Sequence, residues 1–94
     1  MVNLEQNIRQ AIASDEWAAT SHADERLAER KVEAWQVAAA SLTGVTMLVD
    51  PNALPNPKIL IKGMLPDGTE VVIAWAWIES TRQAAVITVN FERV

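Results

Sequence analysis

The sequence predicts one α+β domain in which N-terminal helices pack on an antiparallel sheet of three or four strands. Three observations predict this class. Apolar residues recur at helical spacing before Gly44 and in strand-like runs after it. Short turn signals separate the strand candidates, and short connections join strands that run antiparallel. The chain has 94 residues, which fits one domain over residues 1–94.

Three helical segments are expected in the first half. The first covers residues 3–13, where apolar side chains share one side of a helix. The second begins at Ser21, whose side chain is expected to cap the helix, and continues to about Arg30. After a turn at 31–32, the third ends near Gly44, because glycine just past the last periodic residue is a common stop. Its expected inner side contains Trp35, Ala38, Ala39 and Leu42.

Residues 16–20 are ambiguous, either a short extended piece or the lead into the second helix. The four strand candidates are Val45 to Val49, Lys58 to Met64, Glu70 to Ile78 and Ala84 to Phe91. Three prolines make residues 50–57 an irregular loop, and Pro66-Asp67-Gly68 predicts a tight turn. Both faces of the strand over residues 70–78 are apolar, so it is expected to be central and covered on both sides.

The last strand has one apolar and one more polar face. Alternation assigns Ala85, Ile87, Val89 and Phe91 to the apolar face. It assigns Val86, Thr88 and Asn90 to the polar face. A functional site on the sheet is expected on that second face.

Composition excludes several classes of function. The chain has no cysteine, hence no disulfide, no thiolate nucleophile and no cysteine zinc site, and its single histidine with scattered carboxylates makes no metal-ligand set. No dinucleotide or phosphate-loop motif is present, so no cofactor is expected. No signal-peptide pattern opens the sequence, and the longest apolar run, residues 71–78, is too short to span a membrane. We expect a cytoplasmic protein without membrane association.

The net charge of −4 argues against a broad nucleic-acid surface. Binding to polyanions draws most of its affinity from basic side chains that neutralise phosphates. RNA is therefore a substrate for this chain only if a local basic cluster exists.

One such cluster is predicted on the second helix. His22, Arg26 and Arg30 are spaced four residues apart, which places them in one stripe. A histidine that titrates near neutrality, beside two guanidinium groups, has the composition of an acid/base next to a phosphate clamp. The alternative is an ordinary solvated helix surface, because Glu25 and Glu29 lie nearby.

Tryptophans and one further arginine are also candidates for ligand contact. Trp75 and Trp77 share one strand face, where they either stack on bases or form part of the core. Arg82, in the last turn, is a candidate for reaching a ligand on the sheet. Trp17 and Trp35 are expected to pack against the sheet.

The residues Thr20-Ser21-His22-Ala23, Arg26-Leu27 and Arg30 resemble a bacterial domain-of-unknown-function family whose opening helix reads H-A-x-x-R-(M/L)-x-x-R. The later pieces of that resemblance follow in the same order. They are Asp50-Pro51, Gly63, Asp67-Gly68, Val71 to Ala76 and the closing Ile87-Thr88-Val89.

That family is similar to toxins of the RelE/BrnT type, which are small α+β ribonucleases encoded beside an antitoxin, so a toxin–antitoxin or mobile-element setting is expected. The resemblance implies a RelE-like fold, metal-independent RNA cleavage and an antitoxin partner. His22 would be the acid/base, Arg26 and Arg30 would hold the phosphate, and Thr88, with Arg82, would complete the cleft.

A second hypothesis is a catalytically inactive relative that acts as a small protein-interaction module, including as a homodimer. The acidic net charge, the absence of tyrosine and the tryptophans of the sheet favour it. It predicts that Trp75 or Trp77 is exposed, or buried only in an oligomer.

Overall fold

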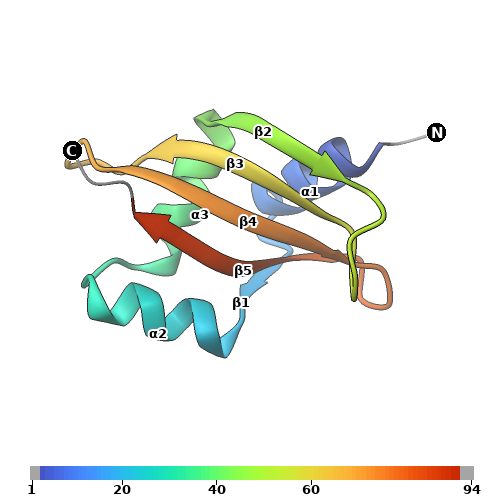
Figure 1. Cartoon of the computed structure of the whole chain (residues 1–94), viewed down its shortest axis with the longest axis horizontal. Helices are drawn as coiled ribbons and strands as arrows, with labels where there is room; N and C mark the ends of the chain where they lie inside the picture. The colour runs from blue at the N-terminus through green and yellow to red at the C-terminus, as the bar shows by residue number, and fades with distance from the viewer. Residues whose placement is uncertain (1–2, 92–94) are drawn as a thin grey trace.

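The computed structural model describes residues 3–91 and contains three helices and five strands in that range (Figure 1). In chain order the elements are α1 (Leu4–Ala13), β1 (Trp17–Ala19), α2 (Ser21–Glu29), α3 (Ala34–Thr43), β2 (Val45–Asp50), β3 (Lys58–Met64), β4 (Glu70–Ile78) and β5 (Gln83–Phe91). The predicted α+β class, with helices first and a sheet second, is confirmed. Among residues 3–91, no helix is long and apolar enough to cross a membrane.

The strands form a single sheet in the order β1-β5-β4-β3-β2. β2 to β5 pair antiparallel as predicted, whereas β1 pairs parallel with β5, so the sheet is mixed. β1 has only three residues, too few for alternation to reveal a strand in the sequence. α1 and α3 cover one face of the sheet, α2 lies beside β5, and no helix within residues 3–91 covers the other face (Figure 1). We call this the uncovered face.

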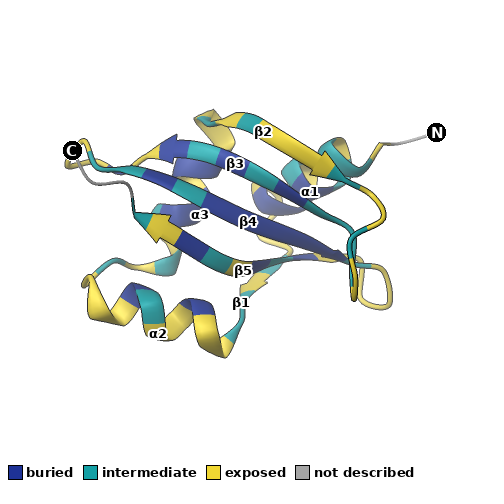
Figure 2. Cartoon of the chain, in the orientation of Figure 1, coloured by how far each residue is buried: buried dark blue, intermediate teal, exposed yellow. Residues whose placement is uncertain are grey.

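The core lies between the sheet and the helices α1 and α3, and β4 runs through its middle (Figure 2). Trp75 on β4 is 0% exposed, and its indole N–H donates to the Ser41 hydroxyl over 2.9 Å. Trp17 packs edge-on against Trp75, with ring centroids 6.0 Å apart. The central position predicted for β4 is confirmed. Helices cover only one of its faces, and the other is lined by small side chains such as Ala74 and Ala76.

The prediction for Trp35 is wrong. Its side chain is 61% exposed, because α3 turns another side toward the sheet. The buried residues of the helix are Val37, Ala38, Ala40 and Ser41. α3 carries no charged residue, and a helix that is apolar all round gives no sequence signal for its inner side.

The start of α2 also differs from the prediction by one residue. Thr20, not Ser21, is the N-cap, and its hydroxyl oxygen accepts a hydrogen bond from the backbone N–H of Ala23. Both residues suit a cap chemically, so sequence alone does not separate them. The turn after α2 is confirmed, since Lys31 has a φ of 56°.

Gly63 allows β3 to lie directly against α3. A methyl group at Gly63 would come within 2.7 Å of the Ala40 carbonyl oxygen, which is a backbone atom. We expect Gly63→Ala to lower the free energy of unfolding by about 1–3 kcal/mol, because α3 must move outward. Urea unfolding measures the loss. Gly68→Asn is the control, because Gly68 has open space around it and asparagine tolerates its positive φ; equal losses for both variants would contradict this explanation.

A polar network fastens α1 to the start of β2. The Arg9 guanidinium donates to the carbonyl oxygens of Ser41 and Gly44 and to the Thr46 hydroxyl, each over 2.9 Å. The Thr46 hydroxyl donates in turn to the Glu5 carboxylate, which also pairs with Arg9. The hydrogen bond from Thr46 is the main cause that lowers the pKa of Glu5 below its usual value. Burial opposes this shift, and the hydrogen bond and charge of Arg9 add to it.

This network predicts a pH-dependent part of the stability. Because the pKa of Glu5 is lower in the folded state, its contribution is present above about pH 4.5 and is lost as the pH falls through the folded pKa. We therefore expect Thr46→Val to destabilise the protein at neutral pH and to matter less in acid. Thermal unfolding across this range measures the difference. Thr43→Val, whose hydroxyl contacts only the Ala40 carbonyl, should show no such pH dependence.

Candidate functional site

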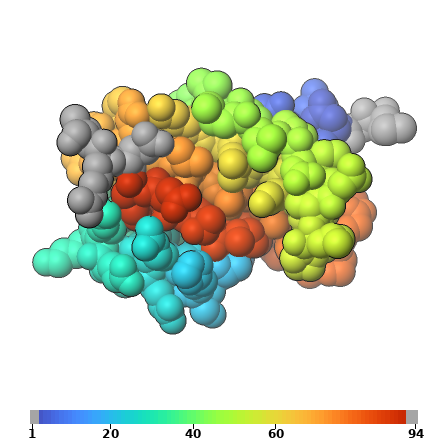
Figure 3. Space-filling view, in the orientation of Figure 1, coloured from blue at the N-terminus to red at the C-terminus, as the bar shows by residue number. Residues whose placement is uncertain are grey.

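The candidate site forms where α2 lies along β5. β1 pairs with the first part of β5 only, up to Val86. Thr20 then bonds the chain to the strand, through its backbone N–H to the Val86 carbonyl over 3.0 Å and through its hydroxyl to the Ile87 carbonyl. From there α2 follows the rest of β5 (Figure 3). The helix thus occupies the place beside β5 that a longer edge strand would take.

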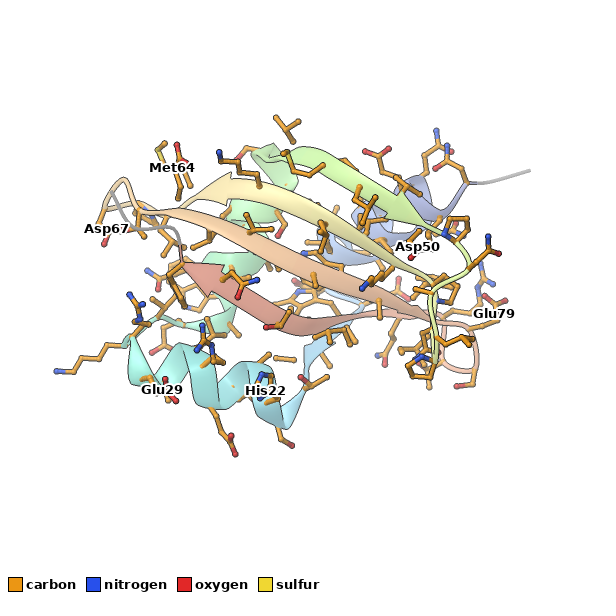
Figure 4. The ribbon with its side chains drawn as sticks, in the orientation of Figure 1. His22, Glu29, Asp50, Met64, Asp67 and Glu79 are labelled. Carbon is orange, nitrogen blue, oxygen red and sulfur yellow. The ribbon has the colours of Figure 1, made fainter. Side chains whose placement is uncertain are left out.

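The predicted stripe lies on α2 in this position. His22 is exposed on the first turn of the helix, below the middle of β5 (Figure 4). Arg26, one turn further on, is half-buried, and the Arg30 guanidinium lies over the Phe91 ring at 4.7 Å from its centroid. Ala23 and Leu27, next to the stripe, are buried and hold the helix in place. The structure therefore places His22 and Arg26 on successive turns of α2 and Arg30 at its C-cap, with the Arg30 guanidinium against Phe91 of β5.

Thr88 lies on the uncovered face, half-buried and opposite Ala74 of β4. Because the hydroxyl of Thr20 bonds to Ile87, the residue before Thr88, the first turn of α2 is close to Thr88 along the strand. The candidate site residues therefore come from two neighbouring segments, His22, Arg26 and Arg30 from α2 and its C-cap and Thr88 from β5.

The predicted faces of β5 are only half right. The register with β4 shifts between Thr88 and Val86, which leaves Ile87 as an extra residue in a β-bulge. Before the bulge, Val86 is buried on the helix side and Ala85 lies on the uncovered face, the reverse of the prediction. After it, Val89 lies on the buried side as predicted. A single bulged residue inverts the alternation, and the sequence carries no signal for it.

Arg82 does not lie with Thr88. It is in the turn between β4 and β5, six residues before Thr88, which is roughly 20 Å along an extended strand. Its guanidinium pairs with Glu79 over 3.1 Å and lies over the Trp77 ring. Figure 4 shows Glu79 at this turn, apart from His22. Arg82 and Trp77 instead line a hollow of about 250 Å³, together with Asn7, Gln10 and Glu16.

The two tryptophans of β4 face the helices. Trp75 has no exposed surface, and Trp77 is 7% exposed with its indole N–H bonded to Glu79. Burial fits the core interpretation of both residues. It leaves Trp75 without a surface that a ligand can contact.

Sequence reasoning missed two residues at this site. Phe91, the ring under Arg30, was assigned only to an apolar strand face, and Thr20 was not identified as the residue that joins α2 to β5. The sequence signal that could have identified Phe91 is its position as an aromatic residue at the end of the last strand.

α2 and its C-cap carry two arginines, Arg26 and Arg30, beside three acidic residues, Asp24, Glu25 and Glu29, so the helix as a whole is not basic. Within residues 3–91 the salt bridges involve Arg9, Lys62 and Arg82, and neither Arg26 nor Arg30 takes part in one. The register also places Lys58 and Lys62 of β3 on the uncovered face. No group of three or more metal-ligating side chains occurs in this described part of the chain.

Fold and site together define a small α+β domain with basic side chains beside an uncovered sheet face. Residues 19–90, which contain all of α2 through most of β5, match the family model DUF4258, described as a domain of unknown function. The chain belongs to this family. No curated protein and no solved structure matches this chain.

Proposed function

We propose that this protein is a toxin-type ribonuclease that cleaves RNA without a metal ion, in a toxin–antitoxin or mobile-element setting. The observation that carries the proposal is the stripe of His22, Arg26 and Arg30 on α2, beside the strand that presents Thr88 on the uncovered face. The similarity of its sequence signature to RelE/BrnT-type toxins supports the same activity.

The proposed reaction uses the ribose of the substrate as nucleophile. The His22 imidazole removes the proton of the 2′-hydroxyl, and the 2′ oxygen attacks the adjacent phosphorus. The bond from phosphorus to the 5′ oxygen breaks, and that oxygen leaves with a proton from water or from the imidazolium. The products are a 2′,3′-cyclic phosphate and a 5′-hydroxyl end. Arg26 and Arg30 stabilise the charge that develops on the phosphate oxygens.

The charge distribution supports RNA as the substrate in spite of the net −4. Arg26 and Arg30 lie on one side of the uncovered face, and Lys58 and Lys62 lie on β3 across it. Lys62 is paired with Glu70 over 3.2 Å, and Lys58 has Asp50 of β2 as its cross-strand neighbour, so each lysine has a carboxylate beside it with which phosphate must compete. A short local cluster of this kind suits a short stretch of single strand.

The test is cleavage of a single-stranded RNA by the purified chain in excess EDTA, followed by analysis of the new ends. We expect cleavage in EDTA and cyclic-phosphate ends. A wild-type chain that leaves RNA intact and does not arrest growth when expressed would refute the proposal, and activity that EDTA abolishes would refute its metal-independent form.

The inactive interaction module is the second candidate, and one observation favours it. The structure exposes large apolar side chains on α3 and β2, including Trp35 and Met47. The prediction of this hypothesis that Trp75 or Trp77 is exposed, or buried only in an oligomer, is wrong, because both side chains are buried within the single chain. RNA cleavage that depends on His22 would decide between the two candidates.

A further inference from the structure

The uncovered face is a continuous surface made of three rows of side chains that cross β2, β3, β4 and β5. The strand register defines each row, because residues paired across a sheet point to the same face. The middle row carries no charge and consists of Leu48, Leu60, Ala74 and Thr88. The two outer rows consist of Asp50, Lys58, Ala76 and Ala85, and of Val45, Lys62, Val72 and Asn90.

This face is apolar although it is open to water. Leu48 is 46%, Met64 57% and Val45 67% exposed. From Val72 to Ile78, the central strand β4 presents only apolar side chains on this face. The solvent face of an antiparallel sheet is normally polar, with apolar residues confined to the core face. The uncovered face therefore lacks a partner in the described part of the single chain.

We infer that a second copy of this chain covers the uncovered face, with sheet packed on sheet. The two-fold axis runs parallel to the strands, above the line between β3 and β4. The middle row becomes smaller from β2 to β5, and this axis reverses its order in the partner. Leu48 and Leu60 of each copy then lie over Thr88 and Ala74 of the other. Large side chains against small ones make the face complementary to itself, which a two-fold interface requires.

Charge also favours a second copy as the occupant. Two chains of net charge −4 repel each other wherever their acidic groups meet. On the strands of the uncovered face, two lysines are balanced by two carboxylates. Lys62 pairs with Glu70 over 3.2 Å, and Lys58 has Asp50 as its cross-strand neighbour. In the proposed arrangement each lysine lies over an apolar β4 residue of the other copy, so no like charges meet.

The uncovered face is large enough for a stable pair. Four strands about 4.8 Å apart and roughly 23 Å long outline a face of about 19 by 23 Å. With its projecting side chains, such a face offers roughly 600 Å² of accessible surface per copy, so two copies bury on the order of 1,200 Å². That area is in the range of specific protein interfaces.

The pair has a consequence for the candidate site. Thr88 lies in the middle row, so a second copy and an RNA strand exclude each other on this face. This consequence rests on the proposed ribonuclease function, and it makes the dimer the inactive form. The rate of RNA cleavage per chain is expected to fall as the chain concentration rises through the dissociation constant of the dimer.

Sedimentation of the full chain tests the pairing. We expect the wild type to have twice the chain mass of 10.3 kDa at high micromolar concentration. Leu48→Glu should weaken association at least tenfold, because it places a carboxylate without a partner in the interface. Leu42→Glu is the matched control. Leu42 is 45% exposed, as Leu48 is 46%, but it lies on α3, which packs on the opposite face of the sheet.

A dimer that Leu48→Glu weakens and Leu42→Glu leaves intact, with unchanged circular dichroism, supports the pairing. A wild type that stays monomeric at high micromolar concentration overturns it, as do equal effects of the two variants. Should Leu48→Glu fail to fold, Val45→Glu takes its place, because Val45 is 67% exposed on the same face.

The pairing and the ribonuclease function can fail separately, because sedimentation needs no RNA. A dimer with no cleavage at any concentration, by the wild type or by Leu48→Glu, refutes the ribonuclease and leaves the pairing supported. Cleavage by a chain that sediments as a dimer, at a rate per chain equal to that of Leu48→Glu, overturns the mutual exclusion.

Discussion

Replacement of His22 by alanine is expected to lower RNA cleavage by about 10²- to 10⁴-fold, the range typical for loss of a positioned general acid or base. His22 is the only histidine in the chain, so no second imidazole can take over its role. The side chain is exposed, and its loss should leave the fold and the melting temperature nearly unchanged. Initial cleavage rates in EDTA, measured beside circular dichroism melts, give both quantities.

The control for this experiment is Glu25→Gln. Glu25 is an exposed residue of the same helix, outside the stripe, and its substitution should leave the rate within a few fold of the wild type. If His22→Ala cleaves RNA as fast as the wild type, another group performs the proton transfer and the assignment of His22 is wrong.

The largest effect on stability is expected from Trp75→Ala. The substitution removes a fully buried indole, its hydrogen bond to Ser41 and its edge-on contact with Trp17. Such changes cost about 3–5 kcal/mol, a large share of the stability of a small domain. We expect the melting temperature to fall by roughly 12–40 °C, or folding to fail at room temperature.

Trp35→Ala is the matched control for that measurement, because it removes the same side chain from an exposed position. Its effect on the stability of the monomer should stay within about 0.5 kcal/mol. Equal losses at Trp75 and Trp35 would contradict the core shown by the structure. Trp75→Phe should lie between the two, since it keeps one apolar ring but loses the hydrogen bond to Ser41 and part of the buried volume.

The elements that could be predicted are those with a long periodic signal. β4 matches its predicted bounds, Glu70–Ile78, because a short apolar run rich in β-branched and aromatic residues, with turn signals on both sides, favours a strand over a helix. The turn at Gly68 was predictable for a different reason. Pro66-Asp67-Gly68 is a turn signal because glycine adopts positive φ without strain, and Gly68 has a φ of 90°.

The rest depended on contacts between distant parts of the chain. β1 exists because Trp17–Ala19 pairs with residues 84–86, and three residues alone carry no strand signal. The bulge at Ile87 is a property of the β4–β5 register rather than of either strand. For the site, spacing predicts one stripe along α2 and its C-cap. It could not show that Arg82 lies at the other end of β5, because strand length and turn position decide that distance.

The parallel pairing of β1 with β5 also sets the order of events during synthesis. The anchor of α2 consists of hydrogen bonds from Thr20 to Val86 and Ile87, partners that the ribosome makes among the last residues described here. A nascent chain that ends before β5 therefore lacks the strand beside which the His22 stripe lies. A nuclease built this way would acquire its activity only after β5 has been synthesised.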